Sequence, residues 1–132
     1  MVDCENEVYT MIADELRRNF SNLDISGTYV SAPAKFPHVS IEMVDNTIMA
    51  KTMDSGDYEV AITVFEINIY SNKANGKKAE CKKIAKVIDN FLLPYNFRRM
   101  ALTPVQNMAN QNIYRLVARY RVATDGKNFY RR

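Results

Sequence analysis

The stretch "YEVAITVFEINIY", residues 58–70, constrains the fold more than any other part of the chain. Its apolar residues alternate with a period of two, which is typical of a β-strand. The two faces carry Val60, Ile62 and Val64 on one side and Phe65, Ile67 and Ile69 on the other. The change of face after residue 64 indicates either a β-bulge or a strand that is buried on opposite faces at its two ends. A strand this long and apolar is predicted to lie in the centre of a sheet.

Two segments have the period of an amphipathic helix. Residues 3–20, "DCENEVYTMIADELRRNF", repeat apolar side chains at three- and four-residue steps, with acidic residues first and arginines last, as the helix dipole favours. Residues 77–93, "KKAECKKIAKVIDNFLL", predict a second helix that ends before Pro94. The lysines of this helix lie mostly outside the apolar stripe, so a solvated outer face is their simplest interpretation.

The remaining segments complete an α+β pattern. Strands are predicted in "HVSIEMVDN" and in the pair "FRRMALTPVQNM" and "NIYRLVARYRVATD", whereas "SNLDISG" indicates a turn. Residues 46–57 have no clean period and predict either a long loop or the loose tip of a hairpin, mobile in the isolated subunit. Residues 125–132 predict either a loose tail or a docking strand. The order of elements favours one domain over 1–132, with a mainly antiparallel sheet and two helices packed on one face.

Charge is distributed unevenly along the chain. Residues 1–76 contain five basic and twelve acidic side chains, whereas residues 77–132 contain thirteen basic and three acidic ones. An asymmetry of this size is typical of a nucleic-acid surface, or of a molecule whose acidic part docks on the basic part of its neighbour. The totals do not choose between these alternatives.

Arginines occupy one face of the last long strand. Arg115, Arg119 and Arg121 alternate with Tyr114 and Tyr120, which fall on the opposite face. A row of guanidinium groups suits bidentate pairing with carboxylates or phosphates, and Arg98 or Arg99 of the paired strand could join it. Readers of single-stranded bases normally expose aromatic rings beside such cations. An acidic protein neighbour or a DNA backbone is therefore a better predicted partner than a base.

The sequence offers little catalytic chemistry. No phosphate-binding glycine loop, nucleophile elbow or zinc-binding pattern is present, so we predict no catalytic residues, no metal and no cofactor. His38 and the two cysteines, Cys4 and Cys81, are interpreted as structural residues. Asp54, Asp57 and Glu59 could gather around a metal, although turn chemistry explains them more simply. No apolar run is long enough to span a membrane, and no signal peptide is recognisable, so no membrane partner is predicted.

The stretches "VAITVFEINIYSN", "NGKKAECKKIAKVIDNFLL", "FRRMALTPVQNM" and "NIYRLVARYRVATD" together resemble the small tail-terminator or tail-completion proteins of long-tailed bacteriophages and prophages. The resemblance covers residues 59–124 most clearly. It implies a non-enzymatic subunit of a ring, commonly a hexamer, that caps the tail tube and joins it to the head connector. It also implies assembly in the bacterial host cytoplasm, a place in the tail or neck of the virion, and passage of DNA through the central hole.

The resemblance gives the patterned residues expected roles. The arginines become subunit contacts or lumen groups near DNA, and the 46–57 loop, with Ile48, Met49 and Met53, becomes a contact segment that orders on assembly. The acidic residues Asp54, Asp57 and Glu59 of one subunit are expected near the arginines of the next. The alternatives are a small nucleic-acid-binding module and another head-to-tail connector, such as a head-closure or minor capsid protein.

Overall fold

The computed structural model describes the chain except for residues 52–58, 107–109, 111 and 131–132. The described part forms one sheet with strand order β1-β2-β3-β5-β4, and β6 pairs with β5 beside β4. A 3₁₀ turn, Leu93–Tyr95, follows the second helix. The helices and strands are α1 (Glu5–Asn19), β1 (Asp24–Ser26), β2 (His38–Lys51), β3 (Glu59–Ser71), α2 (Lys77–Leu92), β4 (Arg98–Gln106), β5 (Tyr114–Thr124) and β6 (Phe129–Tyr130).

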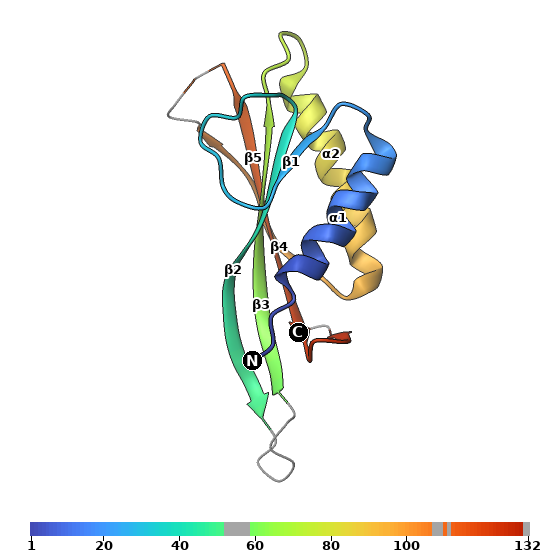
Figure 1. The fold of residues 1–132 in the computed structure, drawn as a ribbon. Coiled ribbons are helices and arrows are strands. Elements are labelled where there is room, and N and C mark those ends of the chain that lie inside the picture. The colour runs from blue at the N-terminus through green and yellow to red at the C-terminus, as the bar shows by residue number, and fades with distance from the viewer. Residues whose placement is uncertain (52–58, 107–109, 111, 131–132) are drawn as a thin grey trace.

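Both helices lie on the same side of the sheet, as Figure 1 shows. Neighbouring strands are antiparallel, except that β1 runs parallel to β2. The prediction of an α+β fold with a mainly antiparallel sheet and two helices on one face is confirmed. We call the other side of the sheet, which neither helix covers, the arginine face.

The hydrophobic core lies between the helices and the sheet. Val8, Ile12 and Leu16 come from α1 at four-residue steps and are buried completely or nearly so. The predicted stripe of α2 is buried in the same way except for Phe91, which is half-buried, and the middle of β3 supplies the other wall. Full burial of one such side chain stabilises a fold by roughly 1.5–3 kcal/mol. The core of the sheet is formed by Val39, Ile41, Phe65, Ile67, Ile69, Leu116, Ala118, Tyr120 and Val122.

The apolar residues of β3 change faces without a bulge in β3 itself. This strand pairs with β5 from Ala61 to Ser71 with no register shift. Its first apolar residues therefore lie on the arginine face, and the small side chains of Ala61 and Thr63 face the helix side, where both are fully buried. Neither alternative drawn from the sequence is confirmed for this strand, because β3 has no bulge against β5, and Ile62 and Val64 are only half-buried on the arginine face.

The predicted loop over 46–57 is wrong for its first half. Residues 46–51 continue β2 and pair with β3, so that Ile48 lies opposite Ala61. Register shifts after Met43 and after Ile48 interrupt the alternation of apolar residues. Two bulges in one strand remove the period of two on which the sequence prediction depends. The second half of the predicted loop lies outside the described residues, and Figure 1 shows the pair of β2 and β3 extending past the start of α1.

Two other local predictions are corrected. "SNLDISG" is not only a turn, because Asp24–Ser26 forms the short strand β1 beside the start of β2. The segment after residue 125 is not loose as far as Tyr130, since β6 pairs with β5 of its own chain. The Asp125 carboxylate closes this turn by accepting hydrogen bonds from the backbone of Lys127 and Asn128 and from the Tyr130 hydroxyl.

Candidate interaction surface

The arginines of β5 share the arginine face, as their alternation predicts. Arg115, Arg119 and Arg121 point away from the core, while Leu116, Ala118 and Tyr120 of the same strand are buried under the helices. Residues directly opposite on neighbouring strands lie on the same face, so the pairing register identifies the neighbours of each arginine. These neighbours divide the arginines into those that have partners within the chain and those that do not.

Arg119 has a partner within the chain. Its Nε and Nη2 donate to Oε1 of Glu66 on β3 at 3.2 and 2.9 Å, and the two residues lie directly opposite each other. The Arg119 side chain is half exposed, so this pair contributes about 0.2–1 kcal/mol. The positive charge of Arg119 is therefore already balanced in the isolated chain.

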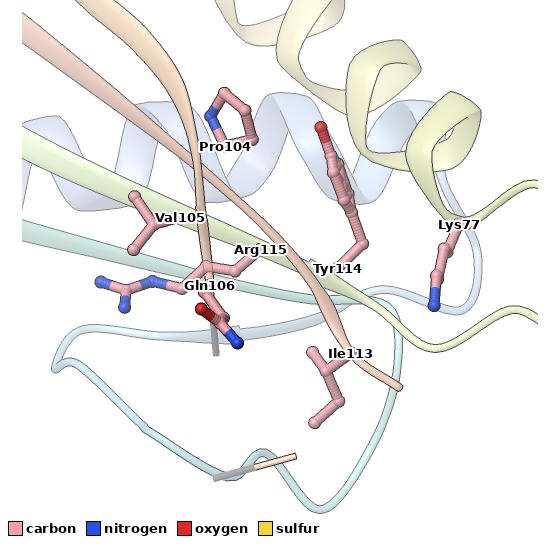
Figure 2. A pocket seen from close by; sticks show the side chains of 7 residues that line it. All are labelled: Lys77, Pro104, Val105, Gln106, Ile113, Tyr114 and Arg115. Atoms are coloured by element: carbon pink, nitrogen blue, oxygen red, sulfur yellow. The ribbon is translucent and has the colours of Figure 1, made fainter. Parts of the chain in front are cut away.

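Arg115 is also held by its own chain. Its Nε donates to Asn68 Oδ1 at 2.8 Å, and its guanidinium lies 5.0 Å from the centre of the Tyr29 ring. Figure 2 shows Arg115 and Tyr114 pointing to different sides of β5, beside a cavity of about 390 Å³. Lys77 lines the same cavity and donates to the carbonyl oxygen of Asn112 at 3.2 Å. Arg115 and Lys77, the two cations beside this cavity, therefore both have partners within the chain.

Arg98 and Arg121, unlike Arg115 and Arg119, have side chains without a partner among the described residues. They lie directly opposite each other on β4 and β5, so the pairing register assigns both residues to the arginine face. Neither side chain forms a hydrogen bond or an ion pair with any residue that the structure describes. The Nε of Arg121 is shielded from water and has no hydrogen-bond partner in this part of the chain. Like charges placed directly opposite each other destabilise a sheet. Because no described carboxylate pairs with Arg98 or Arg121, their repulsion is not balanced within the described part of the chain.

The sequence left open whether Arg98 or Arg99 of β4 joins the arginines of β5. Only Arg98 joins the arginine face, because Arg99 is opposite Tyr120 and therefore lies on the helix side. Arg99 Nη1 is 3.5 Å from Asp89 Oδ1, which also accepts the Tyr120 hydroxyl at 2.9 Å. This group borders a cavity of about 330 Å³ between α2 and β4, whose rim includes Lys82 and Lys86.

The acidic residues expected to meet the arginines are not on the arginine face where the structure describes them. Glu59 lies on the helix side, and its Oε2 accepts the backbone N–H of Val2 at 3.0 Å. Asp54, Asp57 and Met53 lie outside the described residues. Ile48 is 60% exposed in β2, whereas Met49 is half-buried. Whether these residues contact another subunit stays a prediction.

Two carboxylates to which the sequence pattern assigned no role do lie on the arginine face. Glu42 is directly opposite Glu66, and Asp45 is opposite Val64. Glu42 has no hydrogen bond or ion pair with a described residue, while Asp45 accepts hydrogen bonds only from its neighbours Asn46 and Thr47. The alternation in "HVSIEMVDN" already separates Glu42 from the apolar side chains and was the available signal.

His38 belongs to a polar cluster that joins β1 to β2. Its Nδ1 lies 2.8 Å from Asp24 Oδ2, and its Nε2 lies 3.1 Å from Ser26 Oγ. The Ser26 hydroxyl donates to the carbonyl oxygen of Thr28 at 2.8 Å, so its hydrogen is directed away from the imidazole. A serine nucleophile needs that hydrogen bonded to its base, and the arrangement instead suits a structural role for His38.

The two cysteines lie in the interior of the fold. Cys4 and Cys81 are free and buried, and burial raises the pKa of the Cys81 thiol to about 12. The described residues contain no group of three or more histidines, cysteines or acids close enough to hold a metal. Within the same part of the chain, no helix has the length and apolar character of a membrane span.

Comparison with known proteins leaves the surface as the main guide to function. The chain has no match among protein-family models and none among curated proteins. The functional interpretation therefore depends on the fold, on the sheet edges and on the two groups of unpaired charges.

Proposed function

We propose that the protein is a structural subunit of a ring, of the tail-terminator or tail-completion class of long-tailed phages. In this role it ends growth of the tail tube and joins the tail to the head connector, and it performs no catalysis. Its partners are further copies of itself, the tail-tube protein and a head-completion or connector protein, and DNA passes through the ring. The subunit is assembled in the host cytoplasm and becomes part of the virion tail or neck.

The main support for the proposal is that both edges of the sheet are exposed. All nine residues of β4 are exposed, including the apolar side chains of Met100 and Leu102. At the opposite edge, β1 covers only His38–Ser40, and the described sheet has no neighbour along the rest of β2. Exposed edges with apolar side chains are unfavourable for an isolated subunit and are normally protected or paired.

The directions of these edges suit a head-to-tail contact between copies. Three antiparallel steps separate β2 from β4, so the two edge strands run in opposite directions. If the β2 edge of one copy lies beside the β4 edge of the next, the antiparallel alternation continues across the contact. Such a contact uses a different surface on each partner, and repeating it closes a ring when the rotation between copies divides a full turn.

The mass of the native particle tests the proposal. We expect sedimentation and native mass spectrometry to give one closed oligomer, and electron microscopy to show rings that bind the ends of purified tail tubes. A chain that stays monomeric both alone and with tail tubes would refute it. Rings that bind the head connector but never the tail tube would instead favour a head-closure protein.

The nucleic-acid-binding module remains the second candidate because Arg98 and Arg121 have no described partner. A monomer that binds duplex DNA with strong salt dependence would support it. The first candidate is better supported, because Arg115, Arg119 and Arg99 are held by groups of their own chain.

A further inference from the structure

We propose that Arg98 and Arg121 of one copy bind Glu42 and Asp45 of the next copy. This inference rests on the proposed ring and names the residues that form its contact. It replaces the partners expected from the sequence with carboxylates that the structure places on the same face as the arginines.

The basic side of the contact lacks an anion. Arg98 and Arg121 are directly opposite each other, and the buried Nε of Arg121 has no described acceptor. The Glu66 carboxylate on the same face already accepts hydrogen bonds from Arg119, so it does not balance Arg98 or Arg121. An incoming carboxylate would relieve the repulsion between the two guanidinium groups, because a guanidinium binds carboxylates in a bidentate manner.

The acidic side of the contact has negative charges without a cationic partner in the described part of the chain. Glu42 is directly opposite Glu66, so two carboxylates face each other across β2 and β3. Arg119 neutralises only Glu66, and Glu42 is left without a described partner. Asp45 adds a second negative charge on the same face, close to the open edge of β2. This edge therefore favours a cation from outside the chain.

The register places Asp45 and the two arginines in one row across the sheet, and Glu42 in the neighbouring row with Glu66 and Arg119. A row of directly opposite residues crosses the sheet: Asp45 of β2, Val64 of β3, Arg121 of β5 and Arg98 of β4. This row begins with a negative charge at one edge and ends with two positive charges at the other. A second copy with its β2 edge beside β4 and its sheet facing the same way would continue the row, with its Asp45 next to Arg98.

The contact is formed by side chains rather than by a continuous backbone ladder. Pro104 removes one N–H donor from β4, and the register of β4 shifts between Arg99 and Ala101. The outer part of β2 contains two register shifts of its own. Such features prevent unspecific strand addition at an edge. Complementary charges then select the partner and its orientation.

Charge reversal at each edge tests the pairing. The basic-edge variant is Arg98→Glu with Arg121→Glu, and the acidic-edge variant is Glu42→Lys with Asp45→Lys. Each variant alone should sediment as a monomer, because its two edges now carry charges of the same sign. An equimolar mixture should recover the wild-type particle with the two chains alternating, and the chain with all four substitutions should assemble by itself. Self-association of either variant alone is expected to weaken about tenfold or more.

Controls separate this inference from folding defects and from the proposed function. Lys78→Glu with Lys83→Glu makes the same change of charge at exposed positions of α2 and should leave the particle intact. If either double variant loses its native circular dichroism spectrum, the single variants Arg98→Glu and Glu42→Lys replace the double variants in the same experiment. Variants that keep the wild-type mass, or a mixture that stays monomeric, would overturn the pairing while the ring proposal stands. A wild-type monomer would overturn both, and intact rings that lose DNA binding would assign the arginines to phosphate.

Discussion

The hydroxyl of Tyr120 offers a sharp test of how α2 is held against the sheet. Tyr120 is 2% exposed and donates to Asp89 Oδ1 at 2.9 Å, where Arg99 also approaches. Tyr120→Phe removes this hydrogen bond and keeps the ring in the core. The change therefore isolates one polar contact between β5 and α2.

The expected loss follows from the charge and the exposure of the acceptor. A hydrogen bond to a charged group contributes about 1.5–3 kcal/mol to stability. The Asp89 side chain is 32% exposed, so water can replace part of the lost contact. We expect a loss of about 1–2 kcal/mol in the free energy of unfolding, which corresponds to about 4–7 °C in Tm for a chain of this length.

Urea unfolding of Tyr120→Phe and Tyr114→Phe provides the measurement and its matched control. Tyr114 lies on the same side of β5, and its hydroxyl has no hydrogen bond to a described residue, so its loss should change stability by less than about 0.5 kcal/mol. Burial and Asp89 raise the pKa of the Tyr120 hydroxyl. The contribution of this hydroxyl should therefore persist through neutral pH and be lost only as the pH rises above about 10. Equal effects of the two substitutions would refute the assigned hydrogen bond.

The other predictions concern the surface, a turn and a thiol. Lys78→Gln with Lys82→Gln should change the free energy of unfolding by less than about 0.5 kcal/mol and leave the particle mass unchanged, since both lysines are exposed on α2; a loss of assembly would show that this helix face is a contact. Backbone N–H donors lower the pKa of Asp125 to about 2. The Asp125 carboxyl should therefore titrate near pH 2 by NMR, and its hydrogen bonds from the backbone N–H groups of Lys127 and Asn128 should be lost as the pH falls through about 2. A midpoint near pH 4 would contradict the bonded turn. Because burial raises the pKa of Cys81, iodoacetamide at pH 8 should label this thiol only in denaturant, and rapid labelling of the native chain would show that the core opens there.

Periodic segments were predictable because one physical cause dominates each of them. The four-residue spacing of Val8, Ile12 and Leu16 leaves α1 a single apolar stripe to bury. The alternation in β5 likewise assigns Leu116 and Tyr120 to one face of the strand and the arginines to the other. In both elements the sequence pattern and the tertiary packing select the same face.

Other features depend on pairing and leave little trace in the sequence. The second half of β2 was predicted as loop because bulges after Met43 and Ile48 change the phase of its apolar residues. The three residues of β1 are too few for a period and are fixed by parallel pairing with β2. The side on which Arg99 lies follows from its register opposite Tyr120, and a run of two arginines does not reveal it.

The hydrogen bonds of the first residues have a consequence for folding kinetics. The backbone of Val2 donates to Glu59 and accepts from Asn46, and Glu5 accepts the N–H of Met43. The bonds join positions separated by 38 to 57 residues, so closing them costs more chain entropy than closing the β2–β3 hairpin, and we expect them to form after it. Contacts that close after the rate-limiting step change the rate of unfolding much more than the rate of folding. Substitutions at Glu5 or Asn46 should therefore shorten the lifetime of the native state while refolding proceeds at nearly its normal speed.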